Sequence, residues 1–105
     1  MSQDRVIPAE CTTMAEVRQG VDRLDEQIVA LLAERFRYME AAARIKPTRD
    51  RVRDEARKAQ VIANAAAVAT REGLEPQVAA NLYENMVETS IAYELERFDE
   101  RRARA

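Results

Sequence analysis

Apolar side chains recur near the start of the chain in alternating steps of four and three residues. They are Val17, Val21, Leu24, Ile28 and Leu31. This spacing places each side chain on the same helical face as the one before it, as in the seam of a coiled coil. The pattern therefore predicts a helix whose apolar stripe is covered by another helix.

The ends of this helix can be predicted from a few residues. Thr13 and Glu16 have the spacing of a capping box, and Pro47 stops the run of helix-forming residues that ends at Lys46. A helix of about 33 residues is ~50 Å long, since each residue adds ~1.5 Å. The average helix is nearer three turns. Because two shorter neighbours cannot cover so long a stripe, we expect a second copy of the chain to cover it.

Two shorter helices are expected after a polar connection at residues 47–51. The second helix spans residues 52–72, and Gly73 stands where a C-terminal cap is expected. The third begins at Pro76, a favourable first-turn position. The predicted inner face of the second helix consists of Ala56, Ala59, Ile62, Ala63 and Ala66. That of the third helix consists of Ala79, Leu82, Met86, Ser90 and Tyr93.

These patterns predict an all-α fold of three helices, one long and two shorter. Residues 13–100 are expected to form one helical domain, with residues 1–12 as an N-terminal extension and residues 101–105 as a charged tail. A chain of 105 residues and 12.0 kDa has room for one small domain. Two Gly and three Pro are too few to supply the turns of a β-sandwich or barrel.

The composition narrows the possible chemistry. No His and a single Cys (Cys11) exclude Ser-His-Asp and Cys-His catalysis, His-ligated zinc and an internal disulfide. A net charge of −2 and few aromatic residues (two Phe, three Tyr) argue against nucleic-acid binding. No apolar run approaches the ~20 residues of a membrane span, and residues 1–10 lack the order of a secretory signal. We therefore expect a cytoplasmic protein without a membrane partner, metal or cofactor.

Charged residues interrupt the predicted apolar faces. The stripe of the first helix continues to Arg35, which either reaches solvent, pairs with a carboxylate such as Glu84 or Glu94, or meets an anion. Ser90 and Glu94 lie one turn apart on the third helix. Five cations follow one another along the chain: Arg18, Arg35, Lys46, Arg53 and Arg57. Without a nucleophile and base beside them, they suit a small dianionic substrate that is held in position.

Two spacings make geometric predictions. Arg53 and Arg57 are four residues apart, so on one helix both guanidinium groups point the same way. Arg18 and Arg35 are ~25 Å apart on a straight helix, too far for both to hold one small ligand. An antiparallel second copy of the helix would bring the partner's Arg18 toward Arg35. We therefore expect a homodimer with shared sites.

The ordered motifs along the chain resemble those of the all-α chorismate mutase family. They are Arg18-x-x-Val21-Asp22-x-Leu24-Asp25, Leu31-Leu32-Ala33-Glu34-Arg35, Lys46, Val52-Arg53-Asp54-x-x-Arg57, Leu82-Tyr83 and Ser90. The resemblance implies an intertwined dimer of three-helix chains that rearranges chorismate to prephenate without covalent catalysis. It also implies a place in the shikimate pathway, where the product could serve aromatic amino acid biosynthesis, a siderophore pathway or an antibiotic pathway. Arg35, Ser90 and Arg18 of a second copy would bind the substrate carboxylates.

The resemblance also assigns the catalytic contacts. Lys46 would donate a hydrogen bond to the ether oxygen, where negative charge builds as the C–O bond breaks. Arg53 and Arg57 would line the site, and the backbone around Asp54 would meet the ring hydroxyl. Glu94 would lie beside the ether oxygen, where bacterial bifunctional members carry Gln and eukaryotic members carry Glu. A carboxyl group donates only when protonated, so activity is expected to fall as pH rises, provided that burial raises the pKa of Glu94 more than the nearby cations lower it.

Other functions stay open at this point. Lys58 stands where the family often has a Glu that touches the substrate hydroxyl, so a mutase acting on 4-amino-4-deoxychorismate is one alternative. An isochorismate-pyruvate lyase, which releases salicylate and pyruvate, is another, because residues 10–12 and 38–46 resemble that group of enzymes. A helical dimerisation module is the non-enzyme alternative. It would have Arg35 and Lys46 paired internally with no cavity between them.

Overall fold

The computed structural model describes residues 6–104, which form three α-helices and two short 3-10 helices, with no strand among them. The all-α prediction is confirmed. The chain divides within its first long helix into two compact units, one ending at Arg37 and the other beginning at Tyr38. In chain order the elements are η1 (Pro8–Glu10), α1 (Met14–Ile45), η2 (Arg49–Arg51), α2 (Glu55–Arg71) and α3 (Pro76–Arg104).

The first unit consists of η1 and most of α1. The helix begins with the predicted capping box: the Glu16 N–H donates to Thr13 Oγ1, and the Thr13 N–H donates to Glu16 Oε1, both at 3.2 Å. This reciprocal pair satisfies two amide groups that would otherwise have no partner at a helix start. The helix ends at Ile45, one residue before the predicted Lys46, so both predicted ends are confirmed to within one residue.

The apolar stripe of α1 is open to solvent in the single chain. The exposed fractions are Val17 37%, Val21 49%, Leu24 41%, Ile28 51% and Leu31 66%. Apolar surface stabilises a fold only when it leaves water, at about 25 cal/mol per Å². The exposure is what the stripe's length led us to expect, and its covering by a second copy stays a prediction.

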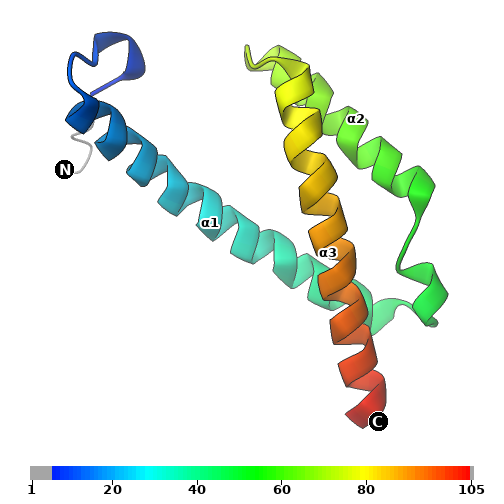
Figure 1. The fold of residues 1–105 in the computed structure, drawn as a ribbon. Helices are drawn as coiled ribbons and strands as arrows, with labels where there is room; N and C mark the ends of the chain where they lie inside the picture. The colour runs from blue at the N-terminus through cyan, green and yellow to red at the C-terminus, as the bar shows by residue number, and fades with distance from the viewer. Residues whose placement is uncertain (1–5, 105) are drawn as a thin grey trace. The chain divides into compact units, whose positions relative to one another are not determined.

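The hydrophobic core lies in the second unit, where α2 and α3 pack side by side (Figure 1). Ala43 from the end of α1 and Val52 from the connection to α2 meet the α3 residues Val87, Ile91 and Phe98, and all five are buried. Partly buried side chains of α2 and α3 complete the cluster: Val61, Ile62 and Leu95. The core therefore joins the segment that carries Lys46 to the middle of α3.

The start of α2 differs from the prediction. The helix begins at Glu55 instead of residue 52, because Asp54 is its N-cap and accepts a hydrogen bond from the Arg57 N–H at 3.0 Å. At the other end, Gly73 has a φ of 80°, the left-handed conformation of a C-terminal cap, as predicted.

The predicted inner face of α2 is partly wrong. Ala56, Ala59 and Ala63 are exposed, whereas the core contacts come from Val61 and Ile62. Alanines are spread around this helix, so they do not mark one side. The β-branched side chains decide the packing because they bury more apolar surface.

The predicted stripe of α3 is also partly wrong. Ala79 and Ser90 are buried as expected, but Leu82 is 63% exposed. The buried face continues instead through Glu94 and Phe98. The helix extends to Arg104, so most of the predicted tail is helical. None of the helices within residues 6–104 combines the length and apolarity needed to cross a bilayer.

Candidate active site

Lys46 and Glu94 form a buried polar pair. Lys46 follows the last residue of α1, and its Nζ lies 2.8 Å from Glu94 Oε2 and 3.5 Å from the Val52 carbonyl oxygen. The Glu94 side chain is 5% exposed and that of Lys46 is 30% exposed. Although the charges are in contact, Glu94 Oε2 accepts no well-aligned hydrogen bond within the described part of the chain. An ammonium has three N–H donors, so the pair retains hydrogen-bonding capacity for a ligand.

Ser90 is buried on the same face of α3, one turn before Glu94. Its hydroxyl donates to the Met86 carbonyl at 2.8 Å, a common arrangement for a serine within a helix. The hydroxyl would have to give up this hydrogen bond before its proton could be donated to a substrate carboxylate. Its role in binding stays a prediction.

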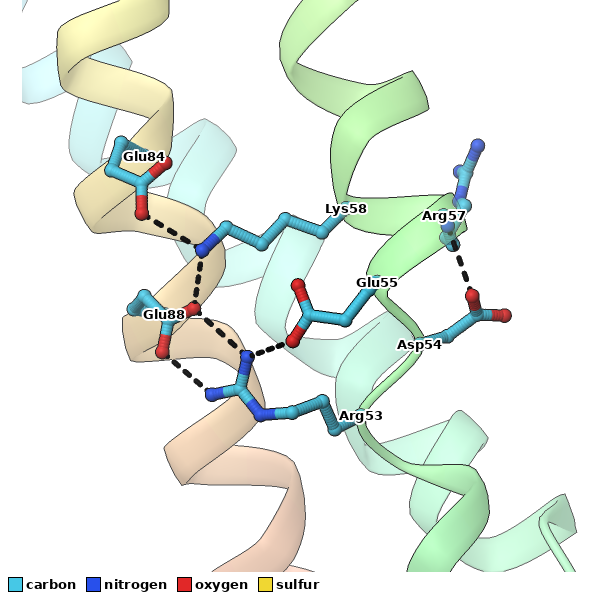
Figure 2. A network of polar contacts seen from close by, with 7 residues as sticks. All are labelled: Arg53, Asp54, Glu55, Arg57, Lys58, Glu84 and Glu88. Carbon is cyan, nitrogen blue, oxygen red and sulfur yellow. Dashed lines mark hydrogen bonds and ion pairs between the residues drawn. The ribbon is translucent and has the colours of Figure 1, made fainter.

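A second polar cluster joins α2 and the residues before it to α3 (Figure 2). The Arg53 guanidinium binds both oxygens of Glu88, at 2.7 and 3.1 Å, and also Glu55 at 2.9 Å. Lys58 Nζ lies 2.6 Å from Glu88 and 2.8 Å from Glu84. Two cations thus meet three carboxylates, so neither Arg53 nor Lys58 presents an uncompensated charge.

The cluster shifts the proton affinity of its members. The hydrogen bonds from Arg53, and after them those from Lys58, lower the pKa of Glu88 from 4.5 to about 2. The hydrogen bonds to Glu84 and then to Glu88 raise the pKa of Lys58 above 10.5. Glu88 therefore stays ionised and Lys58 stays protonated at neutral pH, so the contact between them ties the two helices together there.

The prediction that Arg53 and Arg57 point the same way is wrong. Arg53 precedes the Asp54 cap, so it lies outside the helix whose geometry the prediction assumed. The two guanidinium groups diverge in Figure 2, and Arg57 Nη1 contacts the neutral side chain of Gln60 at 2.5 Å. Unlike Arg53, Arg57 therefore meets an uncharged side chain. The Asp54 carboxylate is occupied in capping the helix.

The remaining predicted site residues, Arg18 and Arg35, belong to the first unit. Arg18 is exposed and Arg35 is partly buried. The two carboxylates considered as partners for Arg35 contact lysines: Glu84 binds Lys58 and Glu94 binds Lys46. The substrate-binding roles of both arginines stay predictions.

The sequence did not point to the residues that fasten the Lys46 segment to α3. Arg102 Nη2 donates to the Lys46 carbonyl at 2.9 Å, and Arg49 binds Asp99 through two hydrogen bonds at 3.0 and 3.3 Å. These residues lie more than 45 positions apart in the sequence, so no local spacing indicates the contacts.

Glu40 is a further acidic residue that the sequence did not single out. It accepts a hydrogen bond from the Tyr93 hydroxyl at 2.6 Å and one from Arg97 at 3.3 Å. The Tyr93 contact is the main cause that lowers the pKa of Glu40. Glu40 thereby ties the end of α1 to α3. Among residues 6–104, no three Cys, Asp or Glu side chains gather as a metal site requires.

The chorismate mutase type II family matches residues 17–95. This range includes both members of the Lys46–Glu94 pair and covers more than half of the chain, so the chain belongs to that family. It is also similar to the isochorismate pyruvate lyase of Pseudomonas aeruginosa, with 29% identity over 98 residues that cover 93% of this chain and 97% of the relative. The resemblance seen in the sequence motifs is confirmed, and the findings support an enzyme of the chorismate mutase type.

Proposed function

We propose that the protein is a chorismate mutase that rearranges chorismate to prephenate. The observation that carries this proposal is the Lys46–Glu94 pair, in which an ammonium with spare donors lies 2.8 Å from a carboxylate that is 5% exposed. Both residues fall within the range matched by the family.

The rearrangement breaks the ether C–O bond of chorismate and forms a C–C bond in one step, so nothing is transferred to the protein. Negative charge builds on the ether oxygen as the C–O bond breaks. Lys46 donates a hydrogen bond to that oxygen and stabilises the transition state more than the substrate. Glu94 donates a second hydrogen bond once it is protonated.

The arginines hold the two carboxylates of the substrate and favour its compact reactive shape. Arg35, Arg57 and Arg18 of a second copy supply this charge in the proposed homodimer. Arg53 contributes less than expected, because Glu88 and Glu55 neutralise it. The open stripe of α1 supports the dimer.

Isochorismate-pyruvate lyase is the second candidate, because the similarity to the Pseudomonas aeruginosa enzyme extends over nearly the whole of both chains. The same cations would serve a reaction that also breaks an ether C–O bond. Assays of the purified protein with chorismate and with isochorismate separate the two. Formation of prephenate supports the mutase, whereas salicylate and pyruvate from isochorismate, with little prephenate from chorismate, would replace it with the lyase.

Substitution of Lys46 tests its role. Lys46→Met is expected to lower kcat by ~10²–10³ with a small change in KM, as for the loss of one donor to a developing oxyanion. Arg71→Gln removes an exposed cation at the end of α2 and serves as the matched control. If Lys46→Met and Arg71→Gln have equal kcat values, Lys46 is not the ether-oxygen donor.

The pH dependence tests Glu94. As a second donor to the ether oxygen, the Glu94 carboxyl group must carry a proton, because an ionised carboxylate only accepts hydrogen bonds. Activity is therefore expected to fall as pH rises. Glu94→Gln, whose amide donates at every pH, is expected to remain active and to lose this fall. A wild-type profile as flat as that of the variant would remove Glu94 from the reaction.

A further inference from the structure

The connection between α1 and α2 begins with Lys46 and is exposed along most of its length. Pro47, Thr48, Arg49, Asp50 and Arg51 are all exposed. Its internal backbone bonds are two: the Arg51 N–H to the Thr48 carbonyl and the Val52 N–H to the Arg49 carbonyl, each at 3.1 Å. Such a segment opens easily unless other contacts hold it.

Arg102 supplies one of those contacts. Its Nη2 donates to the carbonyl of Lys46 at 2.9 Å and to that of Pro47 at 3.5 Å. The guanidinium stacks on the ring of Phe98, with 3.9 Å between Cζ and the ring centroid. Phe98 is 5% exposed and belongs to the core, so it gives the exposed arginine a fixed platform.

Two more contacts fasten the same segment to α3. Arg49 forms a bidentate ion pair with Asp99, with hydrogen bonds of 3.0 and 3.3 Å, and this geometry binds a guanidinium strongly. At the far end of the segment, Val52 is 4% exposed in the core beside Phe98. The segment is therefore tied to one helix at its start, middle and end.

The spacing along α3 relates these contacts to Lys46. Glu94, Phe98 and Arg102 follow one another at intervals of four residues, so they lie on one face of the helix. Lys46 contacts this face twice: its ammonium meets Glu94 and its carbonyl meets Arg102. The side chain and the backbone of Lys46 are thus both held by α3.

We propose that the last turns of α3 clamp the segment 46–52, and that Arg102 and Asp99 are positioning residues for Lys46. Arg102 fixes the backbone from which the Lys46 side chain extends, and Asp99 fixes the next turn through Arg49. The effect on turnover rests on the proposed function, because it takes Lys46 as the donor to the ether oxygen. The mechanical clamp does not depend on that function.

Amide hydrogen exchange of the full-length protein tests the clamp directly. Arg102→Gln is expected to speed exchange at Arg51 and Val52 by about tenfold, because these amides are protected only while the segment is closed. Arg101→Gln is the matched control: it removes an exposed charge one residue earlier, whereas the hydrogen bonds to the Lys46 and Pro47 carbonyls come from Arg102. Equal exchange in the two variants would overturn the clamp.

Kinetics test the positioning role. Arg102→Gln is expected to lower kcat about tenfold with KM within about twofold, since a displaced donor weakens the transition state more than binding. Arg102→Lys keeps the charge but loses the planar fork and its stacking, so it is expected to restore little of the loss. Asp99→Asn is expected to act in the same direction.

The outcomes separate the proposals. Faster exchange with unchanged kcat in Arg102→Gln would overturn the positioning role and leave a mere structural tie. If the wild type turns over neither chorismate nor isochorismate, the proposed function fails, while the exchange comparison still decides the clamp.

Discussion

Replacing Lys46 by Met tests how strongly the buried charge pair contributes to stability. The substitution keeps most of the side-chain volume but leaves the Glu94 carboxylate, 5% exposed, without the ammonium 2.8 Å away. At this distance the attraction is about 6 kcal/mol if the effective dielectric constant is about 20. The cost of removing both charges from water offsets much of this attraction.

The net effect can be bounded. Removing one partner of a fully buried pair costs about 3–5 kcal/mol, because the other charge is left uncompensated. Lys46 is 30% exposed, so water partly screens the pair and lowers the expected cost to about 1–3 kcal/mol. For a domain of this size, each kcal/mol lowers Tm by roughly 4–8 °C. The double variant Lys46→Met with Glu94→Gln removes both charges and is expected to recover most of the loss.

Urea unfolding followed by circular dichroism at pH 7 measures the four free energies of this double-mutant cycle. The protein concentration is held fixed, because association of the chain would shift the midpoint. We expect a coupling energy of about 1–3 kcal/mol between the two positions. Two outcomes would refute the buried pair as a stabilising contact. One is that the free-energy changes of the two single variants add up to that of the double variant, and the other is that Lys46→Met unfolds with a free energy within about 0.5 kcal/mol of the wild type.

Three further predictions concern stability. The pKa of Glu88 is lowered from 4.5 to about 2, so its contacts stabilise the fold fully above pH 4.5 and lose that effect as pH falls toward 2. The Tm of Glu88→Gln should therefore lie below that of the wild type at pH 6 and equal it near pH 2. A difference in Tm that stays the same at both pH values contradicts this. Phe98→Ala should cost about 3–5 kcal/mol in urea unfolding, since the ring is 5% exposed, and a cost under about 1 kcal/mol would contradict its place in the core. Thr13→Ala should cost about 0.5–2 kcal/mol through loss of the capping box, whereas Thr70→Ala, within the last turn of α2, should cost less.

The ends of the helices could be predicted because their causes act within one turn. Thr13 and Glu16 close a reciprocal bond, Pro47 forbids continuation, and Gly73 adopts the positive φ that other residues avoid. The start of α2 was missed because Asp54 was counted inside the helix rather than as its cap. The inner faces were harder, since alanines such as Ala56 lie on several sides of α2.

In the candidate site, too, some features could be predicted from the sequence and others depend on how the helices pack. The resemblance placed Lys46 and Glu94 beside the same ether oxygen, and the structure brings the two side chains together. The pairing of Arg53 with Glu88 depends on the register between α2 and α3, which no local spacing reveals. The interval of four between Glu84 and Glu88 was the available signal, because it places two carboxylates on one helical face.

Because the apolar stripe on α1 is open in the single chain, the concentration of the protein becomes important. If a second copy covers the stripe, as proposed, association is incomplete where copies are scarce, and a helix of 32 residues then shows its apolar side to water. A chain in that state is a substrate for chaperones and proteases, which act on exposed apolar segments. Unpaired copies would then be removed first, so the level of the protein would depend on how fast newly made chains meet, as well as on how fast they are made.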